Sequence, residues 1–225
     1  MRIFSIFLMS ILFTSCVSKT QSFDRSGFTD IKKHIANVEV DLRYFGNHNF
    51  VGRPIRGYHK EVAILSTKAT LALKQVQNEL NEQGIGLKIF DAYRPQKSVR
   101  DFEKWARRIK DTIAKQEFYP DVDKKDLFKL GYIASKSGHT RGSTIDLTLI
   151  DSATKIELDM GSSFDFFGTI SHHATAAITK EQKKNRELLR NTMLKYGFKE
   201  YSEEWWHYTL KEEPFPNTYF DFNIE

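Results

Sequence analysis

The chain has 225 residues, of which 40% are hydrophobic and 28% are charged, and its formal net charge is +5. This length and composition suit a domain with a sizeable core. Lysine and arginine are mixed with aspartate and glutamate, and no basic stripe with interleaved aromatic residues is present, so we do not expect a nucleic-acid partner. The single cysteine, Cys16, excludes a disulfide within the chain.

The first residues carry the pattern of an export signal. An apolar run extends from Ile3 to Phe13, which is too short for a transmembrane helix, and Arg2 is the only charged residue before it. Cys16 follows at the end of this run, in an order that resembles the bacterial lipoprotein signal, although leucine is more usual than Phe13 at its position. An ordinary signal peptide with an incidental cysteine is the alternative.

We therefore expect residues 1–15 to form a lipoprotein signal peptide and residues 16–28 to form a flexible tether. Cys16 would be the acylated first residue of the mature chain, and two or three acyl chains anchor a protein stably. Val17 follows the cysteine where an aspartate would favour the inner membrane. The sequence thus predicts an exported protein, lipid-anchored in the periplasm at the outer membrane.

The mature chain alternates between strand and helix patterns. Alternating apolar residues predict strands, apolar residues at helical spacing predict helices, and Thr179 with Gln182 forms a capping box at the start of the last helix. In chain order, we expect a strand at 38–44, a helix at 66–83, a strand at 87–91, a helix at 99–114, a strand at 144–150, a helix from 179 to just before Gly197, and a hairpin of 198–201 with 205–210.

Two long stretches, 118–137 and 151–173, lack a regular pattern. The second contains the cluster Phe164, Phe166 and Phe167, so we expect an ordered loop that lines a pocket. The irregular order of strands and helices predicts an α+β fold, in which a small, mostly antiparallel sheet is packed with helices around a cleft. We expect a single domain from residue 29 to residue 225.

Two histidines and one aspartate stand in settings that favour a metal site. His139 lies between Gly138 and Gly142, where the backbone can turn freely. Asp146 follows inside an apolar strand, where an unpaired carboxylate is unfavourable, and His207 lies in an aromatic-rich strand. The structural alternatives are an ion pair between Asp146 and an arginine, and a core position for His207. Two imidazoles and a carboxylate suit zinc, which in catalytic sites keeps a fourth position for water.

Two further residues offer acid–base and electrostatic chemistry. Glu204 precedes His207 by three residues, so both can face one cavity, whereas the adjacent Glu203 is expected in solvent. A carboxylate beside zinc can take a proton from water and pass it to a leaving amine. Arg94 follows a strand end, where its guanidinium can hold a carbonyl oxygen and the oxyanion that follows. An ion pair with Asp91 is the alternative role for Arg94.

Ser137 and Asp165 are polar residues that flank the same expected cleft. A carboxylate at Asp165, directly after Phe164, could bind the ammonium group of a substrate. A helix cap or a surface acid is the alternative for Asp165. The adjacent pair His172 and His173 is the only rival metal pair, but adjacent side chains of an extended chain point apart.

Several motifs together resemble one known family. They are S-G-H-T-R-G-S-T-I-D at 137–146, E-W-W-H-Y at 204–208, D-A-Y-R-P at 91–95, D-L-R-Y at 41–44, N-F-V-G at 49–52, D-M-G-S-S-F-D at 159–165 and F-P-N-T-Y-F-D-F in the tail. The chain resembles the D-alanyl-D-alanine dipeptidases, zinc enzymes related to the vancomycin-resistance dipeptidase and more distantly to zinc D,D-carboxypeptidases. The likeness extends from about Val38 to Phe222.

The resemblance implies a role for each matching position. One zinc ion per chain would be held by His139, Asp146 and His207. Glu204 would be the general base and acid, and Arg94 would stabilise the transition state. The ammonium end of the substrate would be held by Ser137 and Asp165.

The resemblance also implies a zinc dipeptidase that hydrolyses D-Ala-D-Ala to two D-alanine molecules, and it implies no protein partner. The expected export departs from the cytosolic resistance enzyme and favours scavenging or recycling of the dipeptide from the cell wall. One alternative is a D,D-carboxypeptidase or endopeptidase that acts on peptidoglycan stem peptides. Another is a non-catalytic lipoprotein that binds the cell wall.

Overall fold

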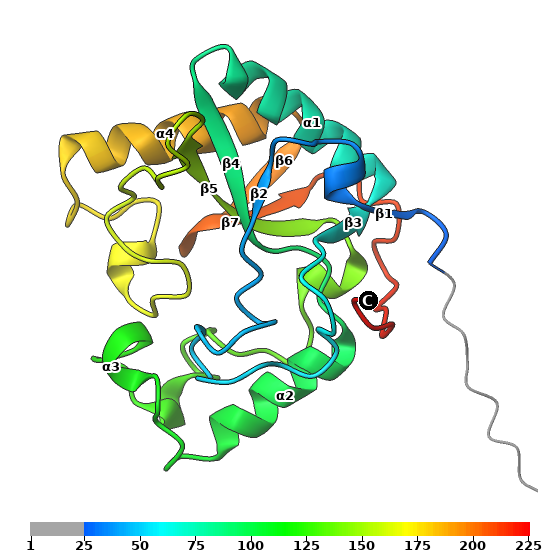
Figure 1. The fold of residues 1–225 in the computed structure, drawn as a ribbon. Coiled ribbons are helices and arrows are strands. Elements are labelled where there is room, and N and C mark those ends of the chain that lie inside the picture. The colour runs from blue at the N-terminus through cyan, green and yellow to red at the C-terminus, as the bar shows by residue number, and fades with distance from the viewer. Residues whose placement is uncertain (1–24) are drawn as a thin grey trace, which may run out of the picture.

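The computed structural model describes residues 25–225 (Figure 1). The expected signal peptide and the acylated Cys16 lie outside these residues. Within residues 25–225, no helix combines the length and the apolar character that a membrane span requires.

A five-stranded sheet forms the centre of the upper half of the molecule in Figure 1. Adjacent strands of this sheet are antiparallel, except for the two strands at one edge, which pair in parallel. A separate antiparallel pair joins β1 (Phe28–Asp30) to β3 (Ile64–Ser66). The order of the large sheet is β2 (Glu39–Val40), β4 (Ile85–Asp91), β5 (Thr144–Asp151), β7 (Glu204–Leu210) and β6 (Phe198–Tyr201). The predicted α+β class with a mostly antiparallel sheet is confirmed.

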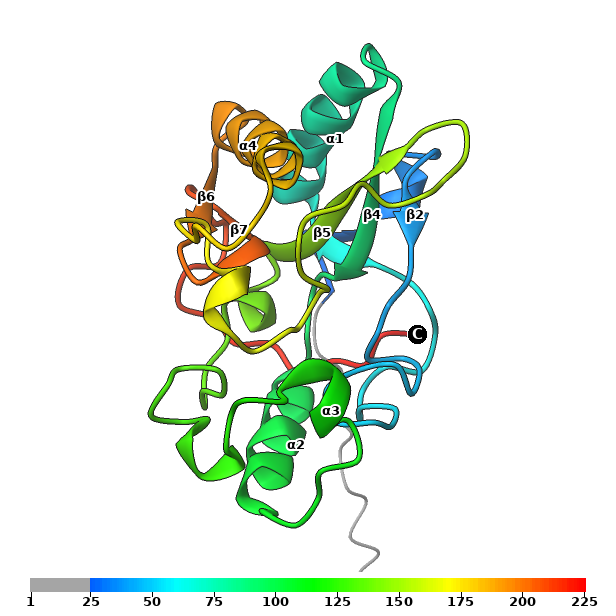
Figure 2. The ribbon, with the colours of Figure 1, turned by 90° about the vertical axis from the view of Figure 1, so that its left-hand side faces the viewer.

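Two long helices pack side by side against this sheet, α1 (Thr67–Asn81) and α4 (Lys180–Lys195) (Figures 1 and 2). Both begin where the sequence predicts, because Ser66 caps α1 and the capping box of Thr179 and Gln182 opens α4. Their buried residues, such as Leu73 and Leu189, complete the core on that side.

The lower half of Figure 1 contains α2 (Gln96–Arg107), the short α3 (Lys115–Phe118) and long connecting segments. Four 3-10 turns complete the elements in the part of the chain that the structure describes: η1 (Ile31–Lys33), η2 (Lys124–Asp126), η3 (Gly138–Arg141) and η4 (Thr169–Ser171). The cleft described below is lined by residues of the sheet and of these lower segments.

The prediction of one helix over 99–114 is wrong at its C-terminal end, because α2 ends at Arg107. The buried ammonium of Lys124 donates hydrogen bonds of 2.7, 2.9 and 2.7 Å to the carbonyl oxygens of Trp105, Arg108 and Asp111. These carbonyls are thereby satisfied without a further helical turn. Ile113, which the helical spacing assigns to the core face, is 75% exposed.

Two other boundaries also differ from expectation. The strand predicted over 38–44 is regular only at Glu39–Val40, although Asp41 and Arg43 still donate backbone hydrogen bonds to β4. Phe28, which the prediction assigns to the end of the tether, lies in β1 and packs edge-on against Tyr93. The aromatic tail returns onto the domain, since Phe222 stacks on Tyr93 at 4.1 Å between ring centroids.

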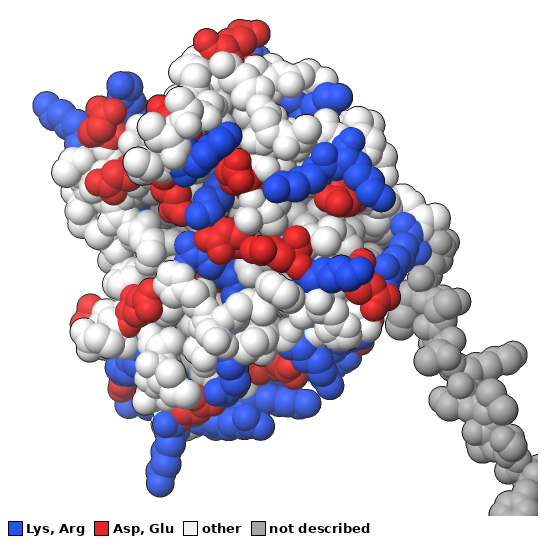
Figure 3. Space-filling model, viewed as in Figure 1, with Lys and Arg blue, Asp and Glu red and all other residues white. Residues whose placement is uncertain are grey.

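Charged side chains of both signs intermix on the face shown in Figure 3. Ion pairs join such groups in the structure: Lys88 lies 3.0 Å from a carboxylate oxygen of Asp41 and 2.9 Å from one of Glu157. This surface has the mixed character that the composition predicts.

Candidate metal centre

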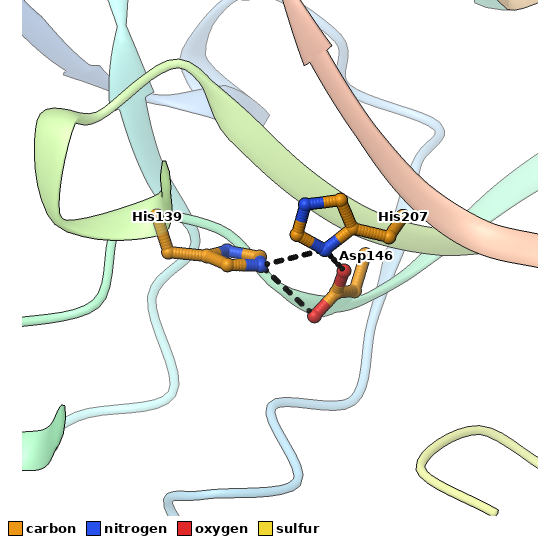
Figure 4. Close-up of side chains that lie close together, drawn as sticks. All are labelled: His139, Asp146 and His207. Atoms are coloured by element: carbon orange, nitrogen blue, oxygen red, sulfur yellow. Dashed lines mark hydrogen bonds and ion pairs between the residues drawn. The ribbon is translucent and has the colours of Figure 1, made fainter. Parts of the chain in front are cut away.

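Three side chains from different elements converge in the cleft: His139 from η3, Asp146 from β5 and His207 from β7 (Figure 4). The Nε2 atom of His139 lies 3.2 Å from Asp146 Oδ2, and the Nδ1 atom of His207 lies 3.0 Å from Asp146 Oδ1. The two imidazole nitrogens are 3.3 Å apart. Among residues 25–225 this is the one cluster of three such groups within ligand distance, and His172 and His173 do not belong to it.

Backbone register fixes two of the three side chains. Asp146 and His207 are direct partners in the antiparallel pair of β5 and β7, so their side chains lie on the same face of the sheet. His139 is placed by the turn before β5: the Ser137 hydroxyl accepts a hydrogen bond from the His139 backbone N–H, and Gly142 ends the turn at φ +81°.

The donor atoms have the chemistry of a cation site. The Nδ1 atom of His139 lies 2.7 Å from the carbonyl oxygen of Ala92, which can only accept, so the proton of the neutral ring is on Nδ1 and the lone pair of Nε2 faces the cluster. Asp146 is 2% exposed, and its Oδ1 atom receives no hydrogen bond. Buried lone pairs that face one another are unfavourable without a cation between them. Two imidazoles and one carboxylate therefore fit zinc.

Charge interactions agree with this arrangement. Burial alone would raise the pKa of the Asp146 carboxyl, but positive charge on the neighbouring rings of His139 and His207 lowers that pKa below its usual range, and a bound cation in place of their protons would act in the same direction. Asp146 is thus kept in the ionised form, which a metal ligand requires.

Glu204 lies at the start of β7, on the edge of the same cluster. Its Oε2 atom is 3.4 Å from His207 Nδ1, and burial raises the pKa of its carboxyl to about 7. Glu203 lies apart and accepts a hydrogen bond from the Tyr201 hydroxyl. Of the two glutamates, Glu204 is the one that lines the cleft.

Arg94 forms an ion pair and also faces the cleft. Its Nε atom donates a 2.8 Å hydrogen bond to Asp91, so the structural ion pair exists. Its Nη2 atom lies 3.6 Å from Asp146 Oδ2, and the guanidinium packs over the rings of Tyr44 and Phe102 while also lining the cleft.

Asp165 is buried and faces the cleft from the loop after β5. It has a left-handed backbone, with φ +60°, and its carboxylate accepts a 2.8 Å hydrogen bond from the Tyr44 hydroxyl. Burial raises the pKa of Asp165 well above its usual range, and the charge of Asp146 acts in the same direction. A cation placed beside Asp165 would relieve this penalty.

The structure therefore brings all seven predicted residues of the described chain to one cavity of about 280 Å³. Sequence reasoning missed two buried partners, Tyr44 and Tyr58, whose hydroxyls bind Asp165 and Asp91. For Tyr44 a signal was available, since it ends the D-L-R-Y motif at 41–44. For Tyr58 the sequence shows no comparable signal.

Comparisons with known proteins bear on this site. A D-alanyl-D-alanine dipeptidase of Enterococcus faecium is 40% identical over 199 residues, which cover 88% of this chain and 98% of that protein. The dipeptidase of Streptomyces coelicolor is 40% identical over 198 residues with the same coverage, and that of Escherichia coli is 30% identical over 189 residues, or 84% of this chain and 87% of that protein. A solved zinc complex of a vancomycin-resistance D,D-pentapeptidase is 12% identical, with a TM-score of 0.40 over 70% of this chain and 78% of that one.

The family model described as D-ala-D-ala dipeptidase matches residues 24–225, which include every side chain of the cluster. Peptidases of this family are zinc-dependent, in agreement with the donor atoms found here. The chain belongs to the D-Ala-D-Ala dipeptidase family of zinc peptidases.

Proposed function

We propose that the protein is a zinc dipeptidase that hydrolyses D-Ala-D-Ala to two D-alanine molecules. The observation that carries this proposal is the buried cluster of His139, Asp146 and His207 with Glu204 beside it, in a cavity of dipeptide size. The family relationship and the names of the relatives support the same substrate.

In the proposed reaction, one water molecule adds to the scissile carbonyl carbon and the C–N bond breaks. A bound zinc ion supplies Lewis acidity, which polarises the carbonyl and makes water more acidic. Glu204 takes a proton from the attacking water and delivers a proton to the departing amine nitrogen. The guanidinium of Arg94, fixed by Asp91, stabilises the negative charge that develops on the carbonyl oxygen.

The other side of the cavity holds the substrate's ammonium end. Asp165 supplies a buried carboxyl group that the substrate's ammonium would hold in the ionised form, and the Tyr44 hydroxyl fixes its position. Ligand cavities for drug-sized molecules start at about 300 Å³. The present cavity of about 280 Å³ lies just below that range and suits a dipeptide.

Aromatic side chains form part of the cavity wall. Tyr132 stacks on Phe167 with 4.7 Å between the ring centroids, and both residues line the cavity together with Tyr201. These residues lie in the two long segments 118–137 and 151–173 and in the β6–β7 hairpin. This wall favours a free dipeptide over the end of a long stem peptide.

The test is amino-acid release from D-Ala-D-Ala, L-Ala-L-Ala and a pentapeptide that ends in D-Ala-D-Ala. We expect turnover of the D,D-dipeptide alone. Cleavage of the pentapeptide would instead indicate the carboxypeptidase. Binding of zinc and dipeptide without turnover of any substrate would instead favour the alternative of a non-catalytic protein that binds the cell wall.

We also propose that the protein is exported and lipid-anchored through Cys16, with residues 1–15 removed and the mature chain in the periplasm at the outer membrane. The support is the order of a short apolar run and a single cysteine at its end. Such an address favours recycling of the dipeptide from the cell wall. Fractionation of cells that express the wild type or Cys16→Ala tests this: the variant should leave the membrane fraction, and an unchanged distribution would refute the anchor.

A further inference from the structure

We propose that Asp91 is a positioning residue of the active site, which orients both Arg94 and His139; the proposal rests on the peptidase function above. Asp91 is the last residue of β4, is 0% exposed, and pairs in register with the metal-cluster residue Asp146. It lines no part of the cavity itself, so it would act only through its neighbours.

Both oxygens of Asp91 are committed to hydrogen bonds. Oδ2 accepts a bond of 2.8 Å from Arg94 Nε, and Oδ1 accepts one of 2.7 Å from the Tyr58 hydroxyl. Because Asp91 accepts the hydrogen bond of the Nε–H group, the Nη groups of the guanidinium stay free to face the cavity, where Nη2 lies 3.6 Å from Asp146. The hydroxyl of buried Tyr58 prevents rotation of the carboxylate away from this position.

The same carboxylate also lies next to a ligand of the metal cluster. Asp91 Oδ2 is 3.6 Å from His139 Nδ1, the nitrogen whose proton is bound by the Ala92 carbonyl at 2.7 Å. A negative charge behind a ligating imidazole raises its basicity and fixes its ring orientation. The short segment Asp91–Ala92 thus supports the metal side of the cavity, and Asp91–Arg94 supports the oxyanion side.

The stability of the fold does not explain why a charged carboxylate is buried at Asp91. A fully buried ion pair gains little over well-packed apolar residues, because both charges lose their hydration. Asp91 is held instead by contacts that all lead to residues of the site or to Tyr58. This arrangement is the one expected when geometry of the site, and not folding, requires the carboxylate.

The test is a double-mutant cycle of Asp91→Asn and Arg94→Met on the zinc-loaded full chain with D-Ala-D-Ala. Asp91→Asn is isosteric and should lower kcat about 10- to 100-fold, the range for residues that support a ligand or a catalytic group, with a smaller change in KM. In the Arg94→Met background, the same substitution should lower kcat less than threefold. Asp41→Asn, another ion-paired aspartate of the sheet region, is the matched control and should leave kcat unchanged.

A second readout does not depend on turnover. Competition with a chromogenic chelator should show zinc binding weakened about tenfold in Asp91→Asn and unchanged in Asp41→Asn. If Asp91→Asn does not fold, Tyr58→Phe removes only the supporting hydroxyl and should lower kcat severalfold by the same route.

Three outcomes would overturn the inference: wild-type kcat in Asp91→Asn, losses that multiply in the double mutant, or unchanged zinc affinity. A wild-type protein that binds zinc but hydrolyses no dipeptide would refute the proposed function. The chelator competition would in that case still decide whether Asp91 supports His139.

Discussion

The two sides of the cavity are built differently. The metal side stands on β5 and β7, where the register of paired strands sets Asp146 opposite His207. The substrate side stands on irregular segments, in which Asp165 has a left-handed backbone and is held by the hydroxyl of Tyr44. Paired strands hold metal ligands in precise positions, whereas loops can vary and so change which substrate fits beside the metal. Variants on the metal side should therefore abolish activity, and variants on the substrate side should change KM.

The largest loss of activity is expected from variants on the metal side. Two variants there separate the role of proton transfer from that of zinc binding. Glu204→Gln removes the proton acceptor but no ligand, so kcat should fall about 10²- to 10⁴-fold while zinc stays bound. His207→Ala removes a ligand, so zinc and activity should be lost together. Zinc content and kcat measured on the same samples test both variants, and full activity of Glu204→Gln would contradict its role as the base.

The substrate side should respond through KM. Asp165→Asn keeps the size of the side chain and a residue that tolerates the left-handed backbone, but removes the charge. A hydrogen bond to a charged group contributes about 1.5–3 kcal/mol, so KM for D-Ala-D-Ala should rise roughly 10- to 150-fold. Tyr44→Phe should raise KM less, because the carboxylate remains. An unchanged KM in Asp165→Asn would contradict the ammonium site.

The turn that carries His139 can be tested through a pair of glycines. Gly142 has φ +81°, and a Cβ atom there would lie 2.1 Å from the Phe28 ring, whereas Gly84 has φ +71° with nothing within 4 Å. Gly84→Ala should cost only the backbone strain, about 1–2 kcal/mol. Gly142→Ala should lower the free energy of unfolding by more than Gly84→Ala does and should also weaken zinc binding. Urea unfolding and chelator competition measure both, and equal effects of the two variants would exclude a steric role for Phe28.

The metal side was open to prediction from the sequence because its signals are local. Asp146 is a carboxylate within an apolar strand, and His207 is a histidine among aromatic residues. Each is an unusual residue for its immediate sequence surroundings. The antiparallel pairing of their strands, which the sequence prediction did not specify, then brings them together. The hairpin at the end of the chain and the capping box of α4 were predictable for the same reason.

Contacts between distant segments were not predictable in this way. Tyr44 and Asp165 are 121 residues apart, and no pattern near either residue indicates their hydrogen bond. The end of α2 depends on Lys124, which lies in a later segment of the chain. Its ammonium group donates hydrogen bonds to the carbonyl oxygens at the end of the helix, although the helical spacing of apolar residues continues to Ile113. Tertiary contacts overrode local spacing there. The buried pair of Asp91 and Arg94, in contrast, lies within one short segment, and the sequence already offered it as an alternative.

The smallest effect is expected away from the cavity, at His173, and it concerns stability at acidic pH. Burial lowers the pKa of His173 to about 4, and its ring packs against Tyr208 with a buried Nε2 atom that has no hydrogen bond. Since the unfolded chain has the ordinary histidine pKa of about 6.5, it binds more protons than the folded chain between these values, and stability falls as the pH drops through that window.

The loss attributable to His173 should reach about 1–2 kcal/mol near pH 4, because the ring is partly solvated. His173→Phe keeps an aromatic ring against Tyr208 without a titrating group, so its unfolding free energy should depend less on pH. Urea unfolding at pH 7 and pH 4.5, with a chelator present so that release of zinc does not contribute, measures the difference. His172→Gln is the control and should retain the wild-type acid sensitivity. If His173→Phe loses as much stability on acidification as the wild type, His173 does not sense this pH range, and the acid sensitivity belongs to the cavity itself.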